Sequence, residues 1–151
     1  NFNFESLQAA KNRLKNWQNI ANMRWQIKGS EGEIPSLAAK NAILEEINEN
    51  LDTPKALAKI DEVFSEIIKA NPEKLNHQNL IELLEFIDYL LGLNLLGLTP
   101  DIPDEIKQKI IERNTARAEK DWAKSDKIRD ELLSKNIVLR DTPKKSFWEY
   151  K

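Results

Sequence analysis

Residues 51–72, LDTPKALAKIDEVFSEIIKANP, contain the start, the apolar face and the end of one helix. Asp52 or Thr53 can accept hydrogen bonds from the exposed N–H groups of a first turn, and Pro54 suits that turn. Asn71 and Pro72 end the pattern. Apolar residues recur between these signals at steps of three and four, as on one face of an amphipathic helix: Ala56, Leu57, Ile60, Val63, Phe64, Ile67 and Ile68.

The same spacing recurs on both sides of this stretch. Upstream it predicts a long helix through Phe4, Leu7, Leu14, Trp17, Ala21 and Trp25, ended by Gly29, Gly32 and Pro35, and then a shorter one through Leu37, Ile43, Leu44 and Ile47. Downstream, the apolar run over residues 80–98 predicts a buried helix that ends near Gly92 and a tight connection into Thr99 and Pro100. The chain contains only four glycines, which argues against a strand-rich domain.

Beyond Pro100 the pattern changes. A helix is expected from about Pro103 to Glu119, and Asp121 can cap a last helix over about residues 122–135. Residues 137–139 and 147–150 are β-prone, with a turn at residues 141–143, so they predict a small hairpin. The expected fold is mainly α: a helical bundle over residues 1–100, followed by a small helix-plus-β-hairpin module over residues 101–151.

The residue inventory gives no support for catalysis. Without cysteine there is no thiolate zinc site, disulfide or cysteine nucleophile, and the single histidine, His77, is expected in a loop or at a helix start. There is no phosphate-cradling glycine loop, and we expect neither a metal site nor a cofactor in this segment. No apolar run approaches the roughly 20 residues that cross a bilayer. We therefore expect no membrane partner and a cytoplasmic location.

Charge is distributed unevenly along a chain whose net charge is −2. Residues 1–100 contain 10 Lys and Arg against 14 Asp and Glu, whereas residues 101–151 contain 13 against 11. Within the second part, cations follow at steps of four, three, four and three: Arg113, Arg117, Lys120, Lys124 and Lys127. They fit a surface that faces phosphates, lining one helix side or clustering at an elbow near Asp121. A solvated helix face is the alternative.

Aromatic and acidic side chains complete this group. Trp122 lies among the cations, and an aromatic ring beside basic groups suits single-stranded RNA, whose bases can stack on it. Asp126 and Asp141 fit such a surface if they accept hydrogen bonds from base amino groups. The alternative is that Trp122 packs beneath its helix and Asp141 caps the turn at residues 142–143.

Residues 112–143, ERNTARAEKDWAKSDKIRDELLSKNIVLRDTP, closely resemble the C-terminal end of bacterial cysteinyl-tRNA synthetases. The family pattern is R-x-x-A-R, then K-D-[WF]-A, A-D-x-[IA]-R-D-x-L and G-I-x-L-x-D. The matching residues are Arg113, Ala116, Arg117, Lys120, Asp121, Trp122, Ala123, Asp126, Arg129, Asp130, Leu132, Ile137, Leu139 and Asp141. Residues 1–14 and 51–58 resemble earlier segments of the same region. Asn136 stands in place of the family's glycine, and asparagine can also take the left-handed conformation.

The resemblance implies a DALR-type bundle in residues 1–100, on the stem side of the tRNA, and an anticodon-binding module in residues 101–151. It places anticodon contacts on Arg117, Asp126 and Asp141, with Trp122 as a stacking or packing aromatic. Arg129, one turn from Asp126, is expected to orient that carboxylate by an ion pair. The implied partners are cysteine tRNA and an upstream catalytic domain of the same chain, which would bind ATP and zinc and ligate cysteine to the tRNA.

Two other hypotheses remain open from the sequence. A related cysteine ligase that makes a small thiol would lack the anticodon module, so the intact segment over residues 113–141 argues against it. A free-standing helical interaction module without tRNA recognition would need a natural start near Asn1.

Overall fold

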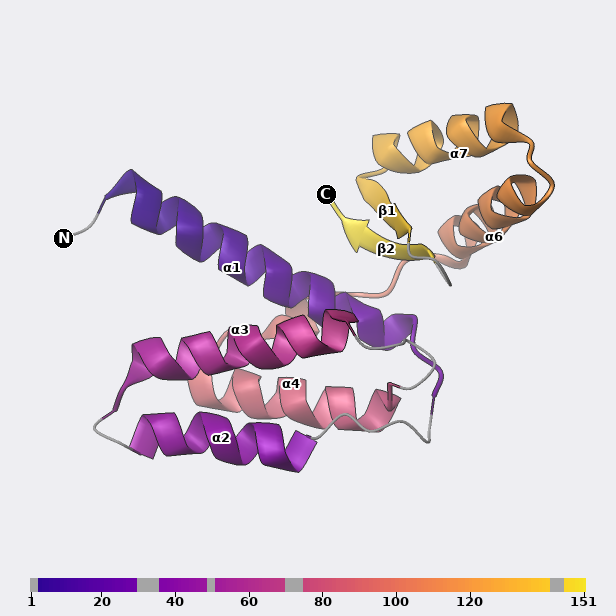
Figure 1. The fold of residues 1–151 in the computed structure, drawn as a ribbon. Coiled ribbons are helices and arrows are strands. Elements are labelled where there is room, and N and C mark those ends of the chain that lie inside the picture. The colour runs from indigo at the N-terminus through magenta and orange to yellow at the C-terminus, as the bar shows by residue number, and fades with distance from the viewer. Residues whose placement is uncertain (1–2, 30–35, 49–50, 70–74, 142–145) are drawn as a thin grey trace. The chain divides into compact units, whose positions relative to one another are not determined.

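The computed structural model describes residues 3–29, 36–48, 51–69, 75–141 and 146–151. The chain forms two compact units, residues 1–99 and residues 100–151. The first is helical in its described residues, and the second adds a two-stranded antiparallel sheet to two helices (Figure 1). The predicted fold, mainly helical with a hairpin at its C-terminal end, is confirmed.

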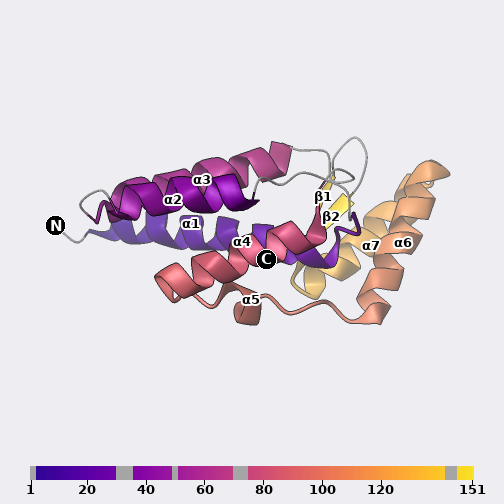
Figure 2. The ribbon, with the colours of Figure 1, turned by 90° about the horizontal axis from the view of Figure 1, so that it is seen from below.

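The first unit contains α1 (Phe4–Asn22), the short 3-10 helix η1 (Met23–Trp25), α2 (Ser36–Asn48), α3 (Thr53–Lys69), α4 (His77–Leu91) and α5 (Leu95–Leu98). α3 packs between α1 and α2, and α2 also contacts α4 (Figure 1). Figure 2 shows α2 and α3 running alongside each other. Asp52 caps α3 as predicted, since its carboxylate accepts from the Lys55 N–H at 3.1 Å. The predicted stops at Gly32, Pro35, Asn71 and Pro72 lie outside the described residues.

The contact between α1 and α3 forms one part of the core of this unit. The Trp17 ring packs edge-on against Phe64, with centroids 5.8 Å apart, and both side chains are buried. The Trp17 indole N–H donates to Asp61 Oδ1 at 2.7 Å, and Arg13 Nε donates to Oδ2 at 2.9 Å. Asp61 therefore satisfies a polar atom that the core would otherwise leave without a partner.

The predicted apolar face of α1 holds only in its second half. Phe4 is 85% exposed and Trp25 is 42% exposed, whereas Trp17 and Ala21 are buried. The α-helix ends at Asn22 and η1 changes the period, so Trp25 leaves the stripe; its indole N–H instead donates to the Thr99 carbonyl at 2.9 Å. Towards its N-terminal end, where Phe4 begins the helix, α1 diverges from α3 (Figure 1).

The end of α4 follows the sequence signal. Gly92 takes the left-handed conformation at φ 66°, and its N–H bonds the Asp88 carbonyl at 2.8 Å. The connection predicted after it contains α5, whose first amides, Leu95 and Leu96, donate to the Asp88 carboxylate at 2.6 and 3.0 Å. His77 is the first residue of α4, in agreement with its expected place at a helix start.

The second unit consists of α6 (Asp104–Ala118), α7 (Trp122–Ser134), β1 (Ile137–Asp141) and β2 (Ser146–Tyr150). The strands pair from Ile137 opposite Tyr150 to Asp141 opposite Ser146. Its core is a cluster of side chains from both helices and both strands: Ile102, Ile106, Ile110, Ile128, Leu132, Ile137, Leu139 and Trp148. α7 ends at a left-handed residue, Asn136 at φ 60°, as its place in the sequence pattern indicated.

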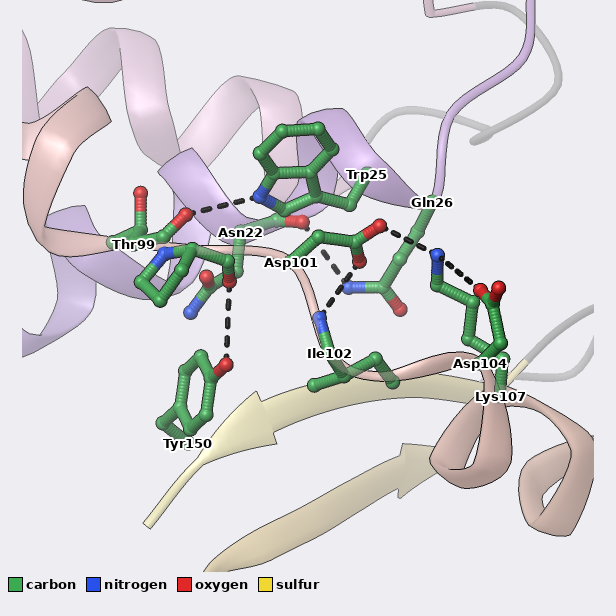
Figure 3. Close-up of polar contacts among 10 residues, drawn as sticks. Asn22, Trp25, Gln26, Thr99, Asp101, Ile102, Asp104, Lys107 and Tyr150 are labelled. Carbon is green, nitrogen blue, oxygen red and sulfur yellow. Dashed lines mark hydrogen bonds and ion pairs between the residues drawn. The ribbon is translucent and has the colours of Figure 1, made fainter.

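At the peptide where the units join, each side is held within its own unit. Trp25 and the buried Arg24 guanidinium donate to the Thr99 carbonyl, at 2.9 and 2.6 Å. On the other side, the Tyr150 hydroxyl donates to the Pro100 carbonyl at 3.3 Å, and Lys107 pairs with Asp101 (Figure 3). Within the described residues, no helix is long and apolar enough to cross a membrane.

Candidate nucleic-acid interface

An elbow between α6 and α7 displays the predicted basic residues. Lys120 adopts the left-handed conformation at φ 61°, and the N–H groups of Lys120 and Asp121 bond the carbonyls of Arg117 and Ala116 at 3.1 and 2.8 Å. These two bonds end α6 in a Schellman-type cap. Asp121 then starts α7, because its carboxylate accepts from the Lys124 N–H at 3.0 Å. The chain therefore changes direction where the sequence placed a helix break.

The side chains around this elbow point outward. Trp122 is 58% exposed, so it does not pack beneath its helix. Lys120, Lys124 and Lys127 are also exposed, and none of the three forms an ion pair with another described residue. The ammonium groups are hydrated and available to a polyanion. The elbow thus combines an exposed ring with three exposed lysines that form no ion pair among the described residues.

Arg113 differs from the expectation that it faces phosphates. Its residue is 3% exposed, because it continues the face of α6 that carries Ile106 and Ile110 into the core. Its two terminal nitrogens each donate to one oxygen of Asp141, both at 2.7 Å. A cation buried this deeply requires such a partner, since an unpaired charge in the interior costs several kcal/mol. Arg113 is therefore an internal residue of the second unit.

Asp141 lies at the centre of a polar cluster at the end of β1. Besides Arg113, its Oδ1 contacts Arg117 Nη1 at 2.7 Å and the Ser146 hydroxyl at 2.5 Å. The Arg113 guanidinium holds the pKa of this carboxyl well below its usual range; the Ser146 hydrogen bond and the Arg117 charge act in the same direction, against desolvation. The side chain remains 32% exposed, so this ionised carboxylate is accessible from solvent.

A shallow pocket beside α7 contains the other predicted base-reading residues. Asp126 and Arg129 line it together with Asp130, and its apolar part comes from Leu133, Ile137, Val138 and Leu139; its volume is about 530 Å³. No ion pair joins Arg129 to Asp126 among the described residues, so the orienting role expected of Arg129 is not seen. Both groups are exposed and directed to the same pocket.

The structure therefore separates the predicted residues into three places. Arg117 and Asp141 meet at the hairpin end, Asp126 and Arg129 line the pocket, and Trp122 lies at the elbow. Sequence reasoning missed Ser146, which bonds Asp141, and it missed the pairing of Arg113. The burial of Arg113 had a signal, because Ile106, Ile110 and Arg113 share one helical face. Among the described residues, no group of three or more His, Cys, Asp or Glu side chains could hold a metal ion.

Comparison with known proteins shows what these residues are similar to. Residues 99–148 match the model of the cysteinyl-tRNA ligase anticodon binding domain. The chain is 35% identical over 161 residues to the cysteine–tRNA ligase of Helicobacter acinonychis (strain Sheeba). It is 30% identical over 161 residues to that of Campylobacter concisus (strain 13826). The chain is homologous to the C-terminal third of cysteine–tRNA ligases.

Each of these two alignments covers 99% of this chain but only 34% of the relative, so the chain spans about a third of the cysteine–tRNA ligases that it matches. The match to the anticodon binding domain runs from Thr99 to Trp148 and includes α6, α7 and β1. The elbow, the pocket and Asp141 all lie inside it. The family resemblance drawn from residues 112–143 is confirmed.

Proposed function

We propose that this chain binds cysteine tRNA and reads its anticodon as part of a cysteine–tRNA ligase. The observation that carries the proposal is the elbow, where the exposed Trp122 ring lies among Lys120, Lys124 and Lys127. Unpaired nucleotides need both elements, because bases stack on rings while phosphates meet cations. The elbow also lies inside the match to an anticodon binding domain.

Base identity would be read in the pocket and at the hairpin end. Asp126 can accept a hydrogen bond from an exocyclic amino group, and Arg129 can donate to a ring nitrogen or a carbonyl. The apolar wall made by Leu133 and β1 suits the face of a base, and the pocket's volume of about 530 Å³ leaves room for one. Arg117 and Asp141 offer a second donor and acceptor pair.

The charge balance indicates how strongly the chain should bind. Its net charge is −2, and in the part of the chain that the structure describes the elbow presents three exposed lysines, so we expect few phosphates to be neutralised. Because each phosphate contact on a single strand contributes roughly −0.7 to the slope of log affinity against log salt, binding should be weak and should fall as salt rises. Selectivity must then come mainly from base contacts.

Other parts of the proposal concern the ligase as a whole. The cysteine–tRNA ligase would activate cysteine with ATP and bind zinc in regions outside this third of the protein. The first unit, over residues 1–99, would support the tRNA on its stem side.

The test is a titration of the 151-residue chain with cysteine tRNA, and with the same tRNA carrying an altered anticodon, at two salt concentrations. We expect tighter binding of the unaltered tRNA and weaker binding of both at high salt. Trp122→Ala should weaken binding by about 5- to 150-fold, as expected for loss of one stacked base. Asp126→Ala should reduce the preference between the two tRNAs.

Two matched controls lie in the first unit. Tyr89→Ala removes an aromatic side chain that is 90% exposed, and Glu85→Ala removes an exposed carboxylate. Because the proposed anticodon contacts lie in the second unit, neither variant should change the preference between the two tRNAs. Equal affinity of the unmutated chain for both tRNAs would refute anticodon reading. No binding at low salt would favour the alternative of a helical interaction module.

A further inference from the structure

Arg113 and Arg117 lie one helical turn apart on α6, yet the structure gives them different environments. Arg113 has 4% of its side chain exposed, whereas Arg117 has 38%. Both contact the same atom, Asp141 Oδ1, at 2.7 Å. Two guanidinium groups therefore share one carboxylate, so Arg113, Arg117 and Asp141 together carry a net charge of +1.

The two contacts differ in geometry. Arg113 forms a two-pronged pair, with each terminal nitrogen donating to a different oxygen of Asp141 at 2.7 Å, which fixes the plane of the carboxylate. Its Nη1 also donates to the Ser146 hydroxyl at 3.0 Å, which ties the first residue of β2 to the same group. Arg117 reaches only Oδ1. Arg113 therefore determines where the Asp141 carboxylate points. Arg117 adds a second positive charge beside a carboxylate that Arg113 already orients.

This difference matters when RNA arrives. If Arg117 turns from Asp141 to a phosphate or a base edge, the carboxylate keeps both bonds from Arg113 and stays ionised and in place. Without Arg113, Arg117 would be the main cation beside Asp141, and its departure would leave a partly buried carboxylate with only a hydroxyl partner. That loss would oppose binding, because removing a charged partner from a sheltered ion costs more than the pair contributes.

We propose that Arg113 is a positioning residue for anticodon recognition. It holds the Asp141 carboxylate towards the RNA, and it allows Arg117 to leave that carboxylate and contact the RNA instead. The inference rests on the proposed function of this surface. Arg113 itself is buried, so it is not a phosphate contact.

The test compares Arg113→Met with Lys109→Met in the 151-residue chain. Lys109 lies one turn earlier on α6, pairs with Glu131 at 2.5 Å and carries the same charge, so its loss matches the change in charge and removes an ion pair elsewhere. For each variant we would measure affinity for cysteine tRNA and for the tRNA with an altered anticodon. Arg113→Met should lower the ratio of the two affinities by about ten-fold, and Lys109→Met should leave that ratio unchanged.

A double-mutant cycle separates positioning from a general loss of structure. If Arg113 acts through Asp141, Arg113→Met should have no further effect on the affinity ratio in a chain that already carries Asp141→Asn. Arg113→Lys keeps the charge but not the fork, so it should restore overall affinity without restoring the ratio. If Arg113→Met does not fold, Arg113→Lys and Ser146→Ala can be compared with Lys109→Met instead. Each of the two should lower the ratio of the affinities for the unaltered and altered tRNAs.

The outcomes distinguish this inference from the function on which it rests. If the unmutated chain binds both tRNAs equally, the proposed function is wrong and the role of Arg113 is wrong with it. If the unmutated chain discriminates and Arg113→Met or Arg113→Lys discriminates equally well, anticodon recognition stands and the positioning role is overturned. A further decrease in the affinity ratio when Arg113→Met is added to Asp141→Asn would likewise overturn the positioning role.

Discussion

Replacing Asp141 with asparagine removes the negative charge that the buried Arg113 guanidinium faces, while the size of the side chain stays the same. Breaking a buried ion pair by removing one partner costs about 3–5 kcal/mol. Two features reduce this figure here: the Asp141 side chain is 32% exposed, and asparagine retains one carbonyl oxygen for Arg113. We therefore expect a loss of about 2 kcal/mol in the free energy of unfolding of the second unit at neutral pH.

Tryptophan fluorescence reports both units, because Trp17 and Trp25 lie in the first and Trp122 and Trp148 in the second. Amide hydrogen exchange over β2 is more selective, since its protection follows the opening of the second unit. A loss of about 2 kcal/mol corresponds to roughly a 30-fold faster exchange of the most protected β2 amides, when exchange follows the opening equilibrium. Amides in the core of α3 should exchange at the unmutated rate.

The matched control is Asp126→Asn, which makes the same chemical change on an exposed side chain that forms no ion pair with another described residue. Its effect should stay within about 0.5 kcal/mol, as for most surface substitutions. Equal exchange rates over β2 in the Asp141 and Asp126 variants would contradict the argument, because the contact between Arg113 and Asp141 would then contribute nothing that asparagine cannot supply.

Two further predictions concern pH and the first unit. The pKa of Asp141 is lowered in the folded chain, chiefly by the Arg113 hydrogen bond, so its contribution to stability is complete above its usual value of 3.8 and is lost as pH falls towards the folded value. Acid unfolding followed by circular dichroism should show a smaller fall in stability below about pH 4 for Asp141→Asn than for the unmutated chain. In the first unit, Asp61→Ala should cost about 1–2 kcal/mol in urea unfolding, because the Trp17 indole N–H loses its acceptor; Asp61→Asn should cost less.

Local signals explain why the helices could be predicted so well from the sequence. Asp52, Gly92, Asp121 and Asn136 each act on the backbone within a few residues of themselves, as a cap or as a left-handed residue. Because such effects are short-range, a sequence pattern contains nearly all the information that decides them. The first half of α1 shows the limit, since the exposure of Phe4 depends on how α1 lies against α3.

The candidate site could be predicted by residue but not by arrangement. The lysines at the elbow are exposed, as the charge pattern indicated. The sequence left open whether Trp122 is exposed or packs beneath its helix, and the structure shows it exposed. The pairing of Arg113 with Asp141 joins residues 28 positions apart, and it depends on the hairpin bringing the end of β1 to α6. Local spacing along a helix carries no information on that contact, so it groups Arg113 with the other cations.

The burial of Arg113 also changes the interpretation of the basic run over residues 113–127. Five cations at helical spacing suggest one charged surface, but the face that carries Ile106 and Ile110 draws Arg113 inward, whereas Arg117 stays at the edge. One arginine then compensates Asp141, and the other becomes the charge in excess. A chain with a net charge of −2 can in this way present a positive edge beside an ionised carboxylate. Donor and acceptor lie side by side there, which is what reading a base edge requires and what a uniformly basic surface could not supply.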